Sequence, residues 1–537
     1  MDMPTRDKTR PPRDIHFREN GTIIKDWGGK LPVALIYPNS YYLGMSNLGI
    51  HTIYKLLNDY DDVVCERVFW EKENADKNTP PVSVESQRPL SDFSILAFSI
   101  SYELDYFNVV SILRASGIPL YATDRDETHP VIIAGGPCIT ANPAPLSPFF
   151  DCLCIGEAEP LLPTMLPVLS EGIGSNRDDL LKTLAALPGI YMPAHPPKTQ
   201  VVRQWAKDID SFATTSVVLT PDTELKDLYL IEAERGCQRG CRFCLVNCIF
   251  SPVRFRSVEK LVTQAEKWLQ FRKRIGLVGP AVTDHPHIVD LLDNLTRLGA
   301  QLSISSLRIG SLSGEVINML AKGNARTITI APEAGSPRLR RLINKGISDS
   351  DILEVADMVG GHRFNNLKLY FMIGLPSETD DDIEDIIKLA LAIKARLDRY
   401  QSGTRLNLNI APFVPKAGTP FQWLPLASLD ILNRRLALLK RNLPARGIKV
   451  KTESPAWSHI QGTLSRGDIR LAEALANIDE ISLSGWRKAI ATCHLDMDYY
   501  IHRKWDTSRK LPWSIIDTSS DEKRLYAEME KALNGTN

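Results

Sequence analysis

Short apolar runs alternate with amphipathic segments over the first third of the chain. Five runs have the length and the β-branched content of buried strands: 33–37, 63–69, 95–99, 131–134 and 152–155. Segments with apolar residues three and four positions apart separate them, as at 48–57 and 106–115. Strands that alternate with helices at this spacing predict a doubly wound, Rossmann-like parallel sheet, whose ligands bind beyond the carboxyl ends of the strands.

The same alternation returns six times from residue 228 onward. The apolar runs are 228–233, 275–278, 302–305, 327–330, 367–372 and 406–411, with helical patterns between them. Six strand–helix units are fewer than the eight of a closed barrel, so we predict a partial (βα)6 barrel. Its functional residues should lie where the strands end.

The chain is too long for one core at 537 residues, so we predict several regions in an α/β protein. They are an N-terminal extension (1–29), the Rossmann-like domain (30–170), a linker (171–226), the barrel (227–424) and a helical, charged C-terminal region (425–537).

The overall charge is balanced, with 64 Lys and Arg against 64 Asp and Glu. A global attraction to nucleic acid or to a membrane surface is therefore not indicated, although a local basic groove for nucleic acid is compatible with this balance. No apolar stretch reaches the roughly 20 residues of a membrane span, and the first residues are charged. We expect a cytoplasmic protein without a membrane partner.

Three of the nine cysteines lie within eight residues, directly after the first strand of the predicted barrel. The segment is Glu234-Arg-Gly-Cys237-Gln-Arg-Gly-Cys241-Arg-Phe-Cys244. Soft thiolates select iron–sulfur clusters or zinc, and a zinc site would favour a second cysteine pair that is absent here. Three thiolates leave one iron of a [4Fe–4S] cluster open. Cys248 is the alternative fourth ligand, which would close the cluster.

This CxxxCxxC motif resembles the signature of the radical S-adenosylmethionine (SAM) superfamily. Members use electron transfer into the cluster to split SAM into methionine and a 5′-deoxyadenosyl radical. Further segments resemble the branch with an N-terminal cobalamin-binding-like domain and one largely uncharacterised family within it. They are Gly135–Pro143, Phe149–Glu159, Ala331–Pro337, Tyr370–Thr379, Pro412–Pro420, Gly44–Gly49, Ser465–Arg470 and Leu511–Trp513.

The resemblance implies residue roles. Cys237, Cys241 and Cys244 would be the metal ligands, and the residues implied for SAM are Phe243, Gly279, Pro280, Arg308, Glu333, Ile373 and Gly374. Within this set Glu333 would bind the ribose hydroxyls and Arg308 the SAM carboxylate. Members of the superfamily usually carry a Gly-Gly-Glu segment whose carbonyls contact the SAM amine, and this chain has Gly279-Pro280 in its place. No catalytic residue is assigned, although Asp284, His285 and His287 follow the second strand and are candidates.

The resemblance also implies a cobalamin site at the strand ends of the first domain. Its residues would be Ser99, Ser101, Gly135, Gly136, Asn142 and Gly156. The Asp-x-His-x-x-Gly motif that supplies a histidine to cobalt is absent, since its nearest imitation, Asp14-Ile-His16, has Glu19 in place of glycine. Cobalamin should therefore bind without a protein histidine on cobalt.

Three functions follow as hypotheses. The first is a cobalamin-dependent radical SAM methyltransferase, or an enzyme of related radical chemistry. The second is a cobalamin-free radical SAM enzyme that modifies tRNA or a ribosomal component, and the third is a non-catalytic iron–sulfur protein. The expected partners are an electron donor such as flavodoxin or ferredoxin and a substrate that the sequence does not identify.

Overall fold

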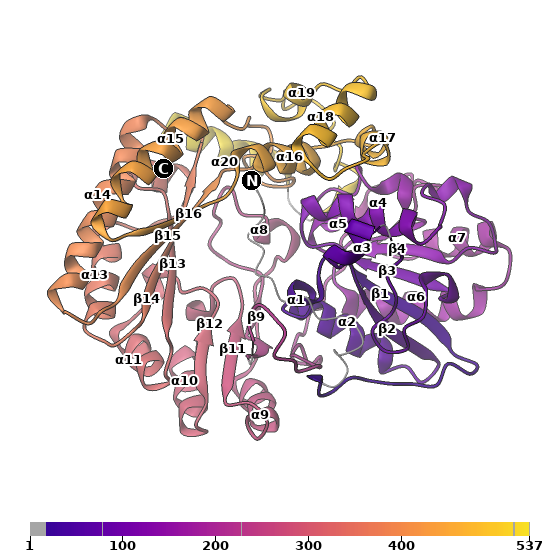
Figure 1. The fold of residues 1–537 in the computed structure, drawn as a ribbon, viewed down its shortest axis with the longest axis horizontal. Helices are drawn as coiled ribbons and strands as arrows, with labels where there is room; N and C mark the ends of the chain where they lie inside the picture. Colours follow the sequence, from indigo (N-terminus) through magenta and orange to yellow (C-terminus); the bar gives the residue numbers. More distant parts are fainter. Residues whose placement is uncertain (1–17, 78, 227, 519–520, 536–537) are drawn as a thin grey trace.

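The structure is a computed structural model that describes residues 18–77, 79–226, 228–518 and 521–535. Asp14 and His16 lie outside the described residues. Figure 1 shows the N-terminal domain beside a half-open barrel, with C-terminal helices over one end of both. None of the described helices is both long enough and apolar enough to cross a bilayer.

The N-terminal domain is a six-stranded sheet of order β2-β1-β3-β4-β5-β6. The first five strands are parallel, namely β1 (Leu31–Tyr37), β2 (Val63–Phe69), β3 (Ile95–Ser99), β4 (Val131–Gly135) and β5 (Cys152–Cys154). This confirms the doubly wound sheet. The short strand β6 (Ile190–Tyr191) pairs antiparallel with β5 and comes from the segment predicted as a linker.

Both faces of this sheet are buried, because alternate residues of each strand pack on different helices. On β1, Val33 and Leu35 belong to the core beneath α2 (Leu48–Asn58), α6 (Ala158–Gly172) and α7 (Arg177–Ala185). Ala34 and Ile36 belong to the core beneath α4 (Tyr106–Ala115). The strand order reverses between β1 and β3, so the loops that follow these two strands flank the point where such sheets bind ligands.

The barrel consists of two parallel sheets. One has the order β12-β11-β8 and the other β13-β14-β15-β16, and an isolated bridge between Leu307 and Ile330 connects them. The strands are β8 (Tyr229–Glu232), β11 (Arg274–Val278), β12 (Gln301–Ile304), β13 (Thr327–Glu333), β14 (Asn366–Ile373), β15 (Arg405–Pro412) and β16 (Lys449–Thr452). The first six confirm the predicted partial barrel, and β16 adds a parallel strand from the C-terminal region.

Six helices cover the convex side of the barrel. They are α9 (Val258–Leu269), α10 (Ile288–Arg297), α11 (Gly314–Lys322), α13 (Asp349–Gly360), α14 (Asp380–Arg399) and α15 (Leu429–Asn442). Burial alternates along the strands as a result: Leu367, Leu369 and Phe371 of β14 are buried beneath these helices, whereas Lys368 and Tyr370 lie on the concave face. This face is turned toward the N-terminal domain in Figure 1.

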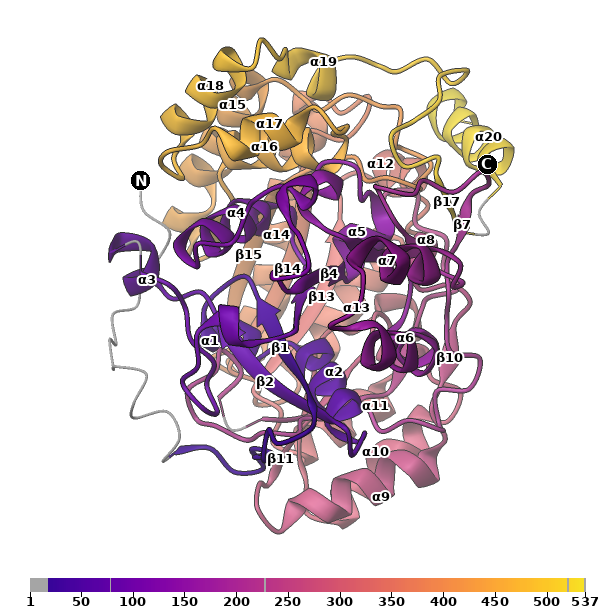
Figure 2. The ribbon, with the colours of Figure 1, turned by 90° about the vertical axis from the view of Figure 1, so that its right-hand side faces the viewer.

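The C-terminal region is joined to the N-terminal domain by a shared core. Its helices are α16 (Pro455–Ser465), α17 (Leu471–Ala476), α18 (Leu483–Thr492), α19 (Met497–Ile501) and α20 (Glu522–Asn534). Phe107 of α4 meets Trp486 of α18 edge to face, with ring centroids 5.4 Å apart. In Figure 2 α16 and α17 lie over α4. The helical character of this region confirms the prediction.

Candidate cluster and cofactor site

The loop that carries the three cysteines follows β9 (Glu234–Arg235), which pairs antiparallel with β10 (Arg254–Phe255). Gly236, at the start of the loop, has φ +82°, and a Cβ there would collide with the carbonyl oxygen of Phe250. Only glycine can therefore adopt this backbone conformation at this position. Cys237, Cys241 and Cys244 are all partly buried.

Among the described residues no three His, Cys, Asp or Glu side chains surround a single metal-ion position. A [4Fe–4S] cluster does not need such a position, because each thiolate bonds a different iron.

Two asparagines fix this loop from outside the motif. Asn247 of α8 (Val246–Ile249) donates to the carbonyl of Cys237 (3.0 Å) and accepts from the backbone N–H groups of Cys241 (3.2 Å) and Gly240 (3.3 Å). Asn344 donates to the carbonyl of Gly240 at 2.9 Å. Asn247 was not identified from the sequence, where nothing distinguishes it from other polar residues near a turn.

Basic side chains face the cysteines. Burial raises the pKa of the Cys237 thiol, which the charge of Arg308 opposes, and raises that of Cys244 to about 12, which Lys345 opposes. Cationic groups at this position would stabilise the thiolate form of the cysteines and the net negative charge of a cluster bound by those thiolates. Cys248 lies elsewhere, buried against Gly418 of the loop after β15.

Glu333 ends β13 in a strained conformation. The register of β13 on β14 shifts at this residue, and its φ is +68°, which is uncommon outside glycine. Its carboxylate lies 3.3 Å from the ammonium group of Lys345. Burial raises its pKa, and Lys345 opposes that shift. Backbone strain of this kind is concentrated at ligand sites.

Unsatisfied polar atoms lie around the same loop. Arg308 has a buried Nε without a partner among the described residues. Glu234 is 2% exposed; its Oε1 accepts from the backbone N–H of Ala281, and its Oε2 is also unpartnered among those residues. Burial and the neighbouring Asp284 raise the pKa of Glu234 to about 7, against that hydrogen bond. A zwitterionic ligand with hydroxyl groups would supply the missing partners, so these residues fit SAM.

The other residues implied for SAM differ in position. Gly279 leaves room for Glu234, because a Cβ there would lie 2.5 Å from the Glu234 Cγ, and Pro280 is exposed beside it. Ile373 is fully buried in the barrel core, and Phe243 packs against the core that the N-terminal domain shares with the C-terminal region. Gly374 has φ +79° and donates its N–H to Glu378 at 2.5 Å.

The polar residues after β11 have structural partners. Asp284 forms a bidentate ion pair with Arg239 of the cysteine loop at 2.6 and 2.7 Å. His285 is buried with both ring nitrogens engaged, by the carbonyl of Arg256 and the N–H of His287. His287 is exposed, with 3.7 Å between its Nδ1 and Asp290.

A buried ion network connects the cysteine loop to the N-terminal domain. Arg235, two residues before Cys237, binds Glu157 and Glu159 at 2.8 Å each. Arg254 binds both oxygens of Glu157 at 2.8 and 2.9 Å. Burial alone would raise the pKa of Glu157, but the two arginines lower it overall. The network was not predicted, because its partners are 76 to 97 residues apart.

The strand ends of the N-terminal sheet combine polar groups and exposed aromatic rings. Ser99 is buried at the end of β3, and Ser101 accepts from Asn47 at 3.2 Å. Tyr42 is 49% exposed and Tyr102 is 40% exposed. Tyr102 lies within electrostatic range of Glu453, which follows β16 of the barrel. This edge is therefore beside the barrel.

Three of the residues implied for cobalamin make protein contacts instead. A Cβ on Gly136 would lie 2.6 Å from the carbonyl oxygen of Ile100, and one on Gly156 would collide with the backbone of Gln204. Asn142 donates to the carbonyls of Ser465 and Gly467 at 3.1 and 2.9 Å.

Gly135, by contrast, has no such constraint: a Cβ there would be 3.5 Å from that of Cys154, an ordinary contact. Ser99, Ser101 and Gly135 thus stay compatible with a ligand at this edge, as do the exposed rings beside them.

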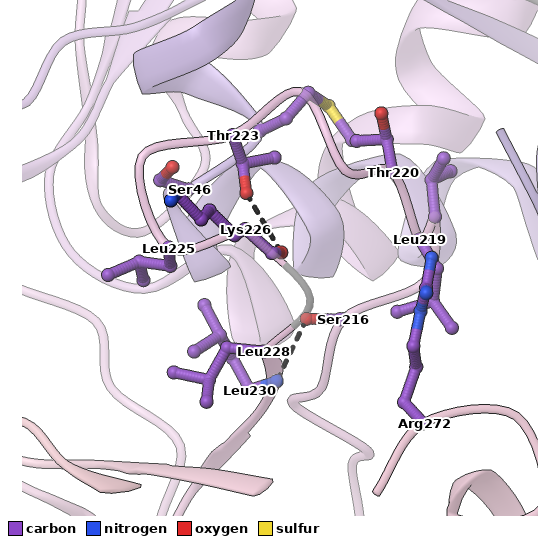
Figure 3. Close-up of a pocket in the computed structure, with 12 residues that line it drawn as sticks. Ser46, Ser216, Leu219, Thr220, Thr223, Leu225, Lys226, Leu228, Leu230 and Arg272 are labelled. Carbon is purple, nitrogen blue, oxygen red and sulfur yellow. Dashed lines mark hydrogen bonds between the residues drawn. The ribbon is translucent and has the colours of Figure 1, made fainter. Parts of the chain in front are cut away.

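Two cavities lie in different parts of the described structure. The cavity in Figure 3 lies between Ser46 and the segment that contains Ser216, Thr223 and Lys226, and its volume of about 10 Å³ holds about one water molecule. A second cavity of about 340 Å³ is lined by four cationic side chains, Arg242, Arg338, Arg341 and Lys531. Arg242 lies between two motif cysteines, so this basic cavity adjoins the cysteine loop.

Comparison with known proteins identifies the superfamily. A model of the N-terminal region of radical SAM proteins matches residues 49–193, and a model of the radical SAM superfamily matches residues 231–390. The chain belongs to the radical SAM superfamily. It is a radical SAM enzyme, whose cofactors include a [4Fe–4S] cluster and SAM.

Relatives of this radical SAM chain are found in archaea and bacteria. An uncharacterized protein of Methanocaldococcus jannaschii is 31% identical over 454 residues, which cover 82% of this chain and 90% of that protein. An uncharacterized methyltransferase of Pyrococcus horikoshii is 24% identical and covers 48% of this chain and 57% of its own length.

Among solved structures, the radical SAM methyltransferase TsrM from Kitasatospora setae with cobalamin and a [4Fe–4S] cluster bound has a TM-score of 0.52. It is 14% identical and covers 87% of this chain and 99% of its own. This likeness confirms the fold of the radical SAM chain over the part that it covers.

Proposed function

We propose that this radical SAM enzyme depends on cobalamin and that its reaction is methyl transfer or related radical chemistry. The observation that carries the proposal is the edge of the N-terminal sheet, where Ser101 and the exposed Tyr42 and Tyr102 follow the strands at the switch point and Tyr102 lies near Glu453 of the barrel side. Exposed aromatic surface at a topological switch point is where a flat macrocycle would bind. The solved methyltransferase of the same fold has cobalamin bound.

The cysteine loop and its surroundings would hold the cluster and SAM. Cys237, Cys241 and Cys244 are the thiolate ligands in this proposal, with Asn247 and Asn344 fixing the loop around them. The bound cluster supplies the electron that cleaves SAM. Arg308 would donate to the SAM carboxylate through its free Nε, and Glu333 would accept from the ribose hydroxyls.

The cobalamin would bind without histidine. The Nε2 of His51 lies 3.1 Å from the carbonyl of Met45, and its Nδ1 accepts from the N–H of Val217, so this buried α2 histidine is not available to cobalt. When bound, cobalamin supplies a methyl carrier. Ser99, Ser101 and Gly135 would contact its corrin ring and tail. Gly136, Gly156 and Asn142 would act indirectly, by fixing the loops of this edge against Ile100, Gln204 and Ser465.

The electron donor would dock at the basic cavity beside the cysteine loop. Arg338 pairs with Asp382, and Arg242 and Lys531 share Glu528, so the four lining cations, which include Arg341, outnumber these two carboxylates and leave the surface electropositive. A flavodoxin or ferredoxin with an acidic face would be attracted to it.

Cobalamin retention tests the proposal. After anaerobic reconstitution with cluster and cobalamin followed by gel filtration, wild type should retain about one cobalamin per chain, because the sheet has one switch point at which it would bind. The bound cobalamin should have a base-off, His-off spectrum. Ser101→Trp should reduce retention, because its ring occupies the proposed site, and its iron content should equal that of wild type. Ser484→Trp, on the exposed surface of α18, is the matched control.

If wild type retains no cobalamin, the proposal fails and the cobalamin-free modification of tRNA or a ribosomal component replaces it. Loss of cobalamin in Ser484→Trp to the same extent as in Ser101→Trp would also contradict the assignment of this edge.

A further inference from the structure

The concave face of the second barrel sheet is polar and cationic. Registered residues of neighbouring parallel strands lie side by side on the same face. Lys368 of β14 pairs with Asn407 of β15, which pairs with Lys449 of β16; one row further along, Tyr370 pairs with Asn409 and Asn409 with Lys451. Arg405 begins β15 on the same face.

The alternation of burial confirms which way these side chains lie. Leu406, Leu408 and Ile410 of β15 belong to the core beneath the outer helices, and the partly buried Val450 of β16 packs against this core. Lys449, Lys451 and Arg405 are exposed, and Tyr370 is 37% exposed. The face is therefore accessible, and Met372 is the only large aliphatic side chain on the concave side of β14 and β15.

The four cations of this face come from three neighbouring strands. Within the described part of the chain, no carboxylate lies at ion-pair distance from Lys368, Arg405, Lys449 or Lys451. The Lys368 ammonium instead lies 5.0 Å from the centroid of the Tyr370 ring. In a chain with equal numbers of basic and acidic residues, four unpaired cations on one sheet face are a local excess.

Protection of the sheet edge against pairing with other chains accounts for only some of these four cations. Lysines on an edge strand such as β16 discourage pairing with other chains. Lys368 and Arg405, however, lie on β14 and β15, which have strands on both sides. The adjacent amides also suit a polar ligand: Asn409 has a buried Oδ1 without a partner in the described structure, and Asn407 donates to Asn366 at 3.1 Å.

We propose that this face binds the phosphate groups of the substrate, which is a phosphate ester such as a nucleotide or an RNA strand. The proposal rests on the function proposed above. Lys368, Arg405, Lys449 and Lys451 would neutralise phosphates, Tyr370 would stack on a base, and Asn409 would accept from it. Lys368 lies four residues, about 13 Å, from Met372 near the strand ends. A substrate that reaches from these cations to the SAM site is therefore extended, with the size of a nucleotide or larger.

Direct binding tests the proposal with two probes on reconstituted holoenzyme. Fluorescence anisotropy would measure the affinity for a labelled short single-stranded RNA, and competition would measure the affinity for uridine diphosphate. The double variant Lys368→Ala/Lys451→Ala should bind RNA about tenfold or more weakly. Loss of two phosphate contacts should also reduce the slope of log K against log salt by about 1.4, between about 50 and 200 mM salt.

Lys388→Ala is the matched control, because Lys388 lies on the outer surface of α14 in an exposed ion pair with Asp385. It should bind both probes like wild type. Arg405→Ala, made separately, should weaken RNA binding with an unchanged melting temperature, since its side chain faces solvent.

Competition by uridine diphosphate at concentrations comparable with RNA would indicate a small phosphorylated substrate, and binding of RNA alone would indicate an RNA strand; both support the proposal. If wild type binds neither probe, or if Lys388→Ala loses as much affinity as the double variant, the proposal is wrong. Formation of 5′-deoxyadenosine and cobalamin retention are measured in parallel on wild type, so that failure of the proposed function is seen separately.

Discussion

Asn247 offers a direct test of how the cysteine loop is held. Its amide makes three hydrogen bonds to the loop, one to the Cys237 carbonyl and two from the N–H groups of Gly240 and Cys241. Asn247→Ala removes all three without touching a cysteine. We expect the variant to assemble a cluster and to lose it faster than wild type.

The magnitude follows from these bonds. A net contribution of about 0.5–1.5 kcal/mol each gives about 3 kcal/mol for three. Asn247 is only partly buried, so water replaces some of this, and we take about 2 kcal/mol as the cost. At 1.4 kcal/mol per factor of ten, the ligand-ready loop becomes about 30-fold less populated.

The assay is release of iron to a coloured ferrous chelator from anaerobically reconstituted protein. If release proceeds through loop opening, Asn247→Ala should lose iron about 30-fold faster than wild type, with the same iron content at the start. Asn442→Ala is the control, because that amide only donates to the Leu438 carbonyl of its own helix. Equal release rates for both variants and wild type would show that the three hydrogen bonds do not stabilise the loop.

Three further predictions concern the cluster, SAM and an unused acid. Cys241→Ala should lose iron while Cys248→Ala keeps about four irons per chain, and equal loss in both would refute an open iron site. Glu333→Gln should weaken SAM binding by about tenfold in equilibrium dialysis, because a charge-assisted hydrogen bond worth about 1.4 kcal/mol is lost, and it should leave the cluster spectrum unchanged. Wild-type affinity in this variant would refute the ribose assignment. Burial and the neighbouring Glu103 raise the pKa of Asp105 from 3.8 to about 7, against a hydrogen bond from Asn39 that lowers it. Because the carboxyl group is harder to ionise in the folded state, the free energy of unfolding falls by up to about 4 kcal/mol as pH rises from about 4 through 7. Asp105→Asn should therefore raise the melting temperature at pH about 8 and much less at pH about 5, and an equal effect at both would refute the buried ionisation.

The strands were predictable because their burial is periodic. All five parallel strands of the N-terminal sheet and six barrel strands lie within a few residues of their apolar runs. The two-residue strand β6 is too short to produce a pattern, and β16 reads Lys-Val-Lys-Thr, with a single apolar residue. Its place in the sheet depends on pairing with β15, which local sequence does not encode.

Cysteine spacing predicted the cluster loop, but the residues that hold it come from distant parts of the chain. Asn344 is 104 residues from Gly240, and Glu157 is 78 from Arg235. Glycines show a second limit. The resemblance placed Gly136 at the cobalamin site and Gly279 at the SAM site, whereas the structure puts Ile100 and Glu234 in the space beside them. The absence of a side chain at a glycine therefore does not show whether a ligand or another residue of the chain occupies the adjacent space.

The ion network of Glu157, Glu159, Arg235 and Arg254 has a consequence for exchanging domains between relatives. A chimera that joins this N-terminal domain to another barrel would bury two carboxylates without their arginines, at a cost of several kcal/mol. The two parts can therefore be recombined only if both sides of the network are transferred together. Substitutions at these four positions should accordingly arise in pairs during laboratory evolution, since each single change leaves a buried charge uncompensated.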